Sequence, residues 1–260
     1  MTPRLVKQLI YGFFYLLILA VILWIIYIAF LQPAPTCFDG HRNQGETGID
    51  CGGPCASCEL ARLKDITVSL NSVVAVPAVN NKTTLLGQIE NPNPGFGAQS
   101  FSYQFQIFGP FGALLKTIDG QSFVYAGERK YLVEPAISIN FQDVKQVKLK
   151  IATSTTVWQS NEQMPKPVLS ATSFKTEIKG NNVSVNGYIK NQNPLTVAET
   201  KIISIIYSSN GVILNASFTT LSNLNGYEER YFDIEIPKGD WTGQMDINQT
   251  KIFIEPAVNQ

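Results

Sequence analysis

The stretch Gly87-Gln88-Ile89-Glu90-Asn91-Pro92-Asn93-Pro94 recurs about 100 residues later as Gly187-Tyr188-Ile189-Lys190-Asn191-Gln192-Asn193-Pro194, a longer period than solenoid repeats have. Both copies read G-x-I-x-N-x-N-P. The shared positions are Gly87, Ile89, Asn91, Asn93 and Pro94 in the first copy, and Gly187, Ile189, Asn191, Asn193 and Pro194 in the second. The repeat predicts two tandem domains of one topology at 61–160 and 167–260, each folding separately.

The local sequence around both copies has the period of β-strands. Apolar and polar residues alternate along Phe101–Ile107 and along Phe232–Ile236, as in half-buried antiparallel strands. Asn210-Gly211 is a strong hairpin signal, because both residues tolerate positive φ. Short strands with regular turns predict a mainly β chain of two β-sandwiches. In the repeated motif, we expect the glycine to relieve crowding and Asn and Pro to end the strand.

The second copy resembles a known family of domains. It opens with G-x-I-K-N-x-N, continues through a strand ending at Tyr207 and the hairpin Asn210–Leu214, and reaches Tyr227-Glu228 before the next strand. This order is similar to FxLYD-type and late-embryogenesis-abundant-type immunoglobulin-like domains, and the resemblance implies an immunoglobulin-like sandwich. The chain departs from the pattern in two places: Ser208 follows Tyr207, and the first copy has Gly109-Pro110-Phe111-Gly112 at the hairpin.

The N-terminal segment has the length and composition of a transmembrane helix. Residues 9–31 are uncharged and as a helix would span about 34 Å, enough for a hydrocarbon core of about 30 Å. A cleaved signal peptide is the alternative, but its apolar region would be shorter. Arg4 and Lys7 precede the run and no basic residue follows until Arg42, so we expect 1–8 in the cytoplasm and the later domains outside.

All four cysteines lie in the segment 32–60, with the spacing C-x13-C-x3-C-x2-C at Cys37, Cys51, Cys55 and Cys58. Outside the cytoplasm such a short, loop-rich stretch favours two disulfides, which replace a core. The three possible pairings stay open. A four-cysteine zinc site is the alternative, and a redox C-x2-C is disfavoured because the surrounding βαβ pattern is missing.

The same segment is rich in oxygen-bearing side chains. The candidate calcium ligands are Asp39, Asn43, Glu46 and Asp50. The alternative is that these side chains form turns and accept bonds from backbone N–H groups. The pattern C-x-D-G-x-x-N-x-G-E-T-G-x-D-C-G-G-x-C-x-x-C resembles a cysteine motif of bacterial surface and secreted proteins, and it implies the envelope of a prokaryote.

Composition narrows the function classes. Formal net charge +0 argues against a nucleic-acid partner, and a single histidine, His41, argues against His-based catalysis or a multi-His metal site. No P-loop, G-x-S-x-G, H-E-x-x-H or dinucleotide motif occurs. We therefore expect a non-enzymatic binding or scaffold protein, anchored in the membrane, whose partner is an envelope protein or surface ligand. A subunit of a secretion or pilus machine and an envelope enzyme are the alternatives.

Overall fold

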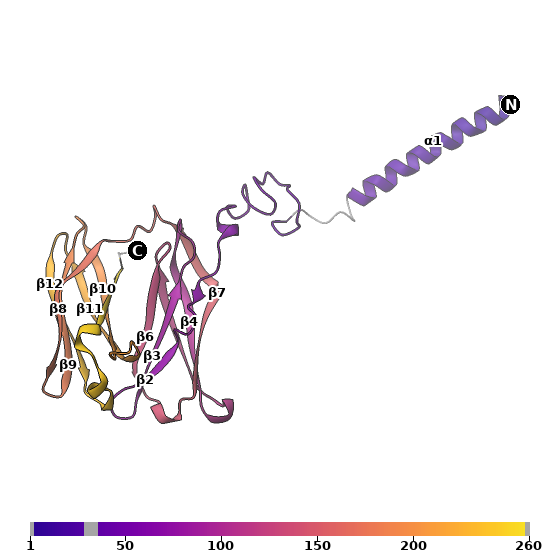
Figure 1. Cartoon of the computed structure of the whole chain (residues 1–260). Coiled ribbons are helices and arrows are strands. Elements are labelled where there is room, and N and C mark those ends of the chain that lie inside the picture. Colours follow the sequence, from indigo (N-terminus) through magenta and orange to yellow (C-terminus); the bar gives the residue numbers. More distant parts are fainter. Residues whose placement is uncertain (1–2, 29–35, 258–260) are drawn as a thin grey trace. The chain divides into compact units, whose positions relative to one another are not determined.

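A computed structural model of the chain describes residues 3–28 and 36–257 (Figure 1). The chain divides into two compact units, Met1–Leu63 and Lys64–Gln260, and each is described by itself. Several predicted segments fall partly outside the described residues, namely 1–2 of the cytoplasmic segment, 29–31 of the helix, 32–35 of the cysteine segment and 258–260 of the second domain.

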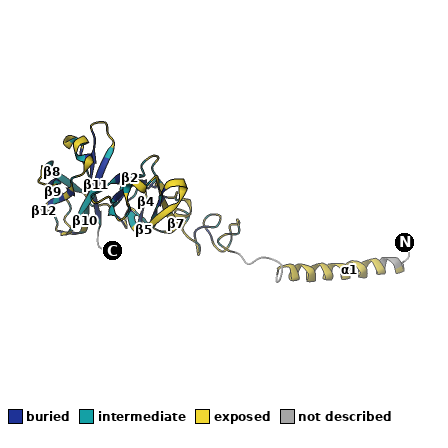
Figure 2. Cartoon of the chain, turned by 90° about the horizontal axis from the view of Figure 1, so that it is seen from below, coloured by how far each residue is buried: buried dark blue, intermediate teal, exposed yellow. Residues whose placement is uncertain are grey.

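The first unit begins with a long apolar helix, α1 (Pro3–Ile26). The window Lys7–Ile26 has a mean hydropathy of 2.7 and no buried residue, and Figure 2 shows the helix as exposed. The helix begins earlier than the predicted span because proline fits the first helical position and the residues after it are acceptable helix formers. Its length and composition fit a membrane span, and a signal sequence would fit them too.

The second unit is built from antiparallel strands, so the mainly β prediction is confirmed. The strands of the first half are β1 (Thr67–Val68), β2 (Val74–Pro77), β3 (Thr83–Glu90), β4 (Phe96–Phe108), β5 (Leu114–Val124), β6 (Arg129–Ile137) and β7 (Gln146–Ser160). Those of the second half are β8 (Leu169–Lys179), β9 (Asn182–Asn191), β10 (Val197–Tyr207), β11 (Ile213–Leu224), β12 (Glu229–Pro237) and β13 (Lys251–Ala257).

Each half is a sandwich of two sheets. In the first half β3 pairs with β1, β2 and β6, and this sheet faces a second one ordered β5-β4-β7. In the second half a sheet ordered β12-β9-β8 faces one ordered β11-β10-β13. The predicted alternating residues fill the two cores: Phe101 and Phe105 are fully buried in the first, and Val183 and Val185 in the second.

A third apolar cluster joins the two halves. Leu86 of β3 and Val133 of β6 pack with Ile203 and Ile205 of β10 and Ala216 of β11. The outer face of the β3 sheet therefore covers the outer face of the β10 sheet, and the two sandwiches lie side by side (Figure 1). Alternation predicted one solvated face for each strand, whereas β3 and β10 bury side chains on both faces.

Polar contacts accompany this shared cluster. The Tyr125 hydroxyl donates to the Pro256 carbonyl at 2.7 Å, and burial raises the pKa of this hydroxyl above its usual value. The Asn215 amide donates to the Pro77 carbonyl at 3.0 Å. Lys130 Nζ lies 3.0 Å from Glu255 Oε2, and both side chains are almost fully buried. Each contact links one half to the other, so the halves share buried polar groups as well as apolar surface.

Candidate functional site

The cysteine segment is closed by two disulfides. Cys37 bonds Cys55, and Cys51 bonds Cys58. The spacing alone allowed three pairings, and this pairing interlocks the two loops along the chain. A sulfur in a disulfide is not the thiolate that zinc binds, so the structure follows the disulfide alternative and not the zinc site.

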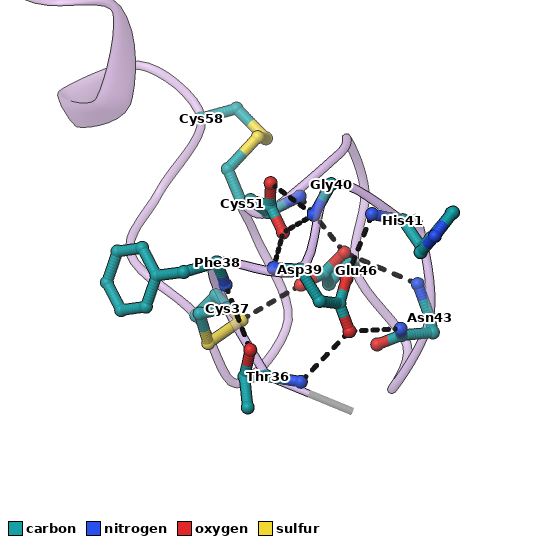
Figure 3. Close-up of a disulfide and its surroundings, with 12 residues drawn as sticks. Thr36, Cys37, Phe38, Asp39, Gly40, His41, Asn43, Glu46, Cys51 and Cys58 are labelled. Carbon is teal, nitrogen blue, oxygen red and sulfur yellow. Dashed lines mark hydrogen bonds between the residues drawn. A yellow bond between two sulfur atoms is a disulfide. The ribbon is translucent and has the colours of Figure 1, made fainter. Parts of the chain in front are cut away.

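Two aspartates hold the first loop of this segment (Figure 3). Asp50 Oδ1 accepts bonds from the backbone N–H of Asp39 and Gly40, at 2.9 and 3.0 Å. Asp39 in turn accepts from the Asn43 amide at 2.8 Å and from the backbone N–H of Thr36 and His41. The Asn43 amide, and then those two N–H groups, lower the pKa of Asp39. His41 itself is exposed, and only its backbone takes part.

Glu46 holds the second loop. It is 4% exposed, and its Oε2 accepts from the backbone N–H of Asn43 at 3.3 Å and of Asp50 at 3.1 Å. Its other oxygen lies 3.1 Å from Cys55 Sγ. The structure therefore brings the four candidate calcium ligands together and gives the oxygens of Asp39, Glu46 and Asp50 the turn role that was the alternative, whereas Asn43 Oδ1 accepts no hydrogen bond within the described residues. Calcium binding stays a prediction of the sequence.

The asparagines of the repeated motif form a buried hydrogen-bond network in the first half. Asn91 donates from Nδ2 to the carbonyls of Phe96 and Tyr125, and its Oδ1 accepts from Asn93. Asn93 then makes two bonds to the backbone of Lys64, where the chain enters the sandwich: Nδ2 donates to the carbonyl at 2.7 Å and Oδ1 accepts from the N–H at 2.9 Å. The side-chain amide of Asn93 thus pairs with the Lys64 backbone as the peptide group of a neighbouring strand would.

The second half repeats this network. Asn191 donates to the carbonyls of Leu195, Leu224 and Asn225, and its Oδ1 accepts from Asn193. Asn193 bonds both backbone groups of Val168, at 3.0 and 3.2 Å. In both halves, therefore, the second asparagine fixes the segment that leads into the sandwich.

The other motif positions pack. Ile89 and Ile189 are fully buried in their cores. A Cβ on Gly87 would lie 2.6 Å from Leu149 Cδ2, whereas one on Gly187 would lie 2.7 Å from the Cα of Phe174. Pro94 and Pro194 lie against the glycines of the facing turns, Gly127 and Gly226. Every motif residue thus has a contact within the fold.

The motif occupies one end of the sandwiches, and the longer loops occupy the other, which we call the loop end. It consists of residues 78–82, 109–113, 138–145, 208–212 and 238–250, which connect strands at the end away from Lys64 (Figure 1). Both halves contribute to it. The motif end has exposed turns too, Tyr227 among them, but the longest connection, residues 238–250, belongs to the loop end. Binding residues are most often found on such loops.

A groove of about 690 Å³ opens at the loop end between the two halves. Its lining comes from residues 77–81 and 140–142 of the first half and from Ile213, Leu214, 238–241 and Gln244 of the second. Sequence reasoning missed this groove, because it treated the halves as independent and a groove between them depends on their packing. The run Ile202-Ile203-Ser204-Ile205-Ile206 was the available signal, since consecutive apolar residues indicate a strand buried on both faces.

Comparison with known proteins gives little further information. No family model and no curated protein matches the chain. Among solved structures, the chain is similar to the crystal structure of red sea bream transglutaminase, at 8% identity and a TM-score of 0.26. The match covers 76% of this chain and 32% of that one, so the chain spans about a third of its length. A likeness of this size carries no argument about function.

Proposed function

We propose that this chain is a non-enzymatic, membrane-anchored binding or scaffold protein of a prokaryotic cell envelope. In this proposal α1 stays uncleaved and crosses the membrane, the N-terminus stays in the cytoplasm, and the cysteine segment and the tandem sandwiches lie outside. Arg4 and Lys7 near the start of α1 support that orientation.

The observation that carries the proposal is the pairing of all four cysteines in a segment that follows an apolar helix. Disulfides persist in oxidising compartments and are rare in the cytosol. Every cysteine of the chain takes part, and no free cysteine occurs among the described residues. A segment of this size has little core of its own, so its folding depends on these bonds and hence on export.

The arrangement of the sandwiches supports a binding role. Chain entry is fixed at the motif end through Asn93 and Lys64, while the loop end has the longer loops and the groove. Loops gathered at one end of a rigid sandwich can present side chains to a partner. The shared apolar cluster would keep the two halves in one arrangement while they do so.

Thiol measurement on the full chain tests this proposal. In membranes from cells that express the chain, mass spectrometry after alkylation without reductant should find all four cysteines unlabelled, and labelling should need prior reduction. The expected linked peptides contain Cys37 with Cys55 and Cys51 with Cys58. Reduced thiols with one zinc ion per chain would contradict the proposal.

A further inference from the structure

Three exposed apolar residues surround Asn193 at the motif end of the second half. Val168, Leu195 and Tyr227 are exposed by 56%, 75% and 65%. The Asn193 side chain bonds both backbone groups of Val168, and the Asn193 carbonyl accepts from the Tyr227 N–H at 3.1 Å. Leu195 comes two residues after Asn193, and its carbonyl accepts from the Asn191 amide at 2.9 Å. We call the three exposed residues the apolar tip, because these bonds hold their backbones together.

The first half forms the same end without apolar side chains at these positions. Asn93 bonds the backbone of Lys64, and the Gly127 N–H donates to the Asn93 carbonyl at 3.0 Å, as the Tyr227 N–H does in the second half. Gly95 comes two residues after Asn93, and a Cβ there would meet nothing within 4 Å. The fold therefore requires none of the three side chains of the apolar tip.

Tyr227 also has a backbone conformation that favours glycine. Its φ is +61°, and the φ of Gly127 at the equivalent position is +64°. Positive φ is unfavourable for a bulky residue, and a ring that is mostly exposed gains little from burial to offset that cost. A strained residue of this kind is a reason to look for a function.

The outer sheet face of the second half shows the opposite exchange. In the first half Leu86 and Val133 pair across β3 and β6, and they pack in the cluster between the halves. A hundred positions later, Asn186 and Asp233 pair across β9 and β12, and Ser184 bonds both of their side chains. This face of the second half thus carries a polar network, whereas its motif end carries an apolar cluster. Such a cluster on an exposed end indicates a contact with an apolar partner.

The path of the chain joins α1 to the same end of the sandwiches. The segment that follows α1 enters the sandwiches at Lys64, at the motif end. The linker 161–168 runs from this end of the first half to the apolar tip, since Asn161 bonds the Gly95 carbonyl and Val168 is part of the tip. A tether raises the effective concentration of the joined end at the bilayer, so three side chains can sustain a contact that would be weak without it.

The composition of the apolar tip fits the interface of a lipid bilayer. A tyrosine has an apolar ring and a polar hydroxyl, and such rings are enriched at the headgroup level of membranes. Leucine and valine gain free energy when lipid replaces water around them. Charged side chains beside the tip are paired: Lys166 Nζ lies 2.6 Å from Glu128, and Arg230 lies 2.6 Å from Glu228. The tip therefore offers apolar contact and little attraction for anionic headgroups.

We propose that the apolar tip inserts into the headgroup region of the membrane that holds α1, with the Tyr227 ring at the interface. The inference rests on the proposed function, because only an uncleaved α1 keeps the sandwiches at the bilayer. Insertion of the motif end would leave the loop end free for a partner.

The test uses the full chain in phosphatidylcholine vesicles, with an environment-sensitive dye on Val168→Cys. The dye reacts with this residue alone, since the native cysteines are paired. We expect its emission to shift to the blue and a lipid with a nitroxide near its headgroup to quench it. Phe111→Cys is the control, because Phe111 is as exposed as the tip but lies at the loop end, and its dye should not be quenched.

Variants of the tip then show whether its own side chains make the contact. Leu195→Gly combined with Tyr227→Gly installs the residues of the first half. We expect it to reduce the quenching at position 168 by about half, because membrane binding scales with the apolar area buried. The melting temperature should change little, since glycine suits a φ of +61°. Phe111→Gly is the matched control: it also removes an exposed ring at positive φ, and it should leave the quenching unchanged.

Four results would overturn the proposal: the dye at position 168 is not quenched, the dye at position 111 is quenched as strongly, the double glycine variant is quenched like the original chain, or quenching needs anionic phosphatidylglycerol. A blue shift without quenching would place the tip against a second copy of the chain and would also contradict it. A cytoplasmic C-terminus or a cleaved α1 in cells would contradict the proposed function and leave the vesicle result unchanged, so the two failures are distinguishable.

Discussion

The Asn93 side chain and the Lys64 backbone are joined by two hydrogen bonds, of 2.7 and 2.9 Å, in a geometry that Asn193 and Val168 repeat. The first pair is the better protected, since Asn93 is 6% exposed and Asn193 is more open. An asparagine at this position therefore fastens the start of each sandwich to the end of its motif strand.

Removing the bonds between the Asn93 side chain and the Lys64 backbone should destabilise the sandwiches. Asn93→Ala removes both bonds to the partly buried Lys64 backbone, while Asn91 Oδ1 keeps its bond from the Asn93 backbone N–H. A fully buried unpaired group costs about 1–3 kcal/mol, so we expect a loss near the lower end of that range. Asn193→Ala should cost less, because solvent can reach its partners. Urea denaturation measures the free energy of unfolding of the two variants. Equal losses would show that burial does not decide how much these asparagine hydrogen bonds stabilise the fold.

The motif glycines should differ in the same way. Gly187→Ala places a methyl group 2.7 Å from the backbone of Phe174, which can move little, and overpacking of this kind costs about 1–3 kcal/mol. Gly87→Ala meets only the end of the Leu149 side chain, which can rotate, so its loss of melting temperature should be smaller. Calorimetry of the two variants gives the comparison, and a larger loss for Gly87→Ala would contradict it.

The same calorimetry tests how the halves unfold. The sequence predicted separate domains, but Leu86 and Ile203 meet in a cluster that belongs to both halves. We therefore expect one transition for the sandwiches, shifted as a whole by Gly187→Ala. Two resolved transitions, of which Gly187→Ala lowers only one, would contradict this and support two domains that fold separately.

How far the sequence predicts this fold depends on whether a strand is buried on one face or two. Alternation located the strands around Phe101–Ile107 and Phe232–Ile236, since each has one face toward a core. It did not predict that β3 and β10 pack against each other, because alternation of polar and apolar residues is the pattern of a strand with one solvent-exposed face. The number and redox state of the cysteines followed from the sequence, while their pairing depends on the path of the loop.

The oxygen ligands show a second limit of sequence reasoning. Asp39, Glu46 and Asp50 read equally well as calcium ligands or as turn residues, because both roles use a carboxylate in a glycine-rich loop. Only the positions of the backbone N–H groups show the turn role, and these positions depend on the disulfides. The groove could not be predicted from the sequence either, because its lining comes from both halves and depends on how they pack.

The buried pair Lys130 and Glu255 should show strong coupling. Glu255→Met leaves the Lys130 ammonium buried and unpaired, and breaking a buried pair in this way costs about 3–5 kcal/mol. The double variant with Lys130→Met should lose less than either single variant, because neither member of the pair is then left buried without its partner. A double-mutant cycle in urea checks this, and additive losses would show that the two charges do not stabilise each other.

Asp39 should make the cysteine segment sensitive to acid. Its pKa is lowered in the folded chain, first by the Asn43 amide. Its contribution to stability is therefore present above the unfolded pKa of about 3.9 and is lost as pH falls through the lower folded pKa. Carboxyl NMR should give a midpoint lower than that of an unfolded peptide, and Asn43→Ala should raise it. Thr36→Ala keeps the backbone N–H donor and should not, so a shift there would contradict the assigned cause.

The central claim is that α1 crosses the membrane with the sandwiches outside, and a reporter fused after residue 260 tests it most directly. Arg4 and Lys7 should hold the N-terminus in the cytoplasm, so a phosphatase that needs an oxidising compartment should be active. Moving those two charges to positions 32–35 should lower the activity, and the membrane fraction should hold the whole uncleaved chain. An inactive phosphatase together with an active cytoplasmic reporter at the same position would contradict the account.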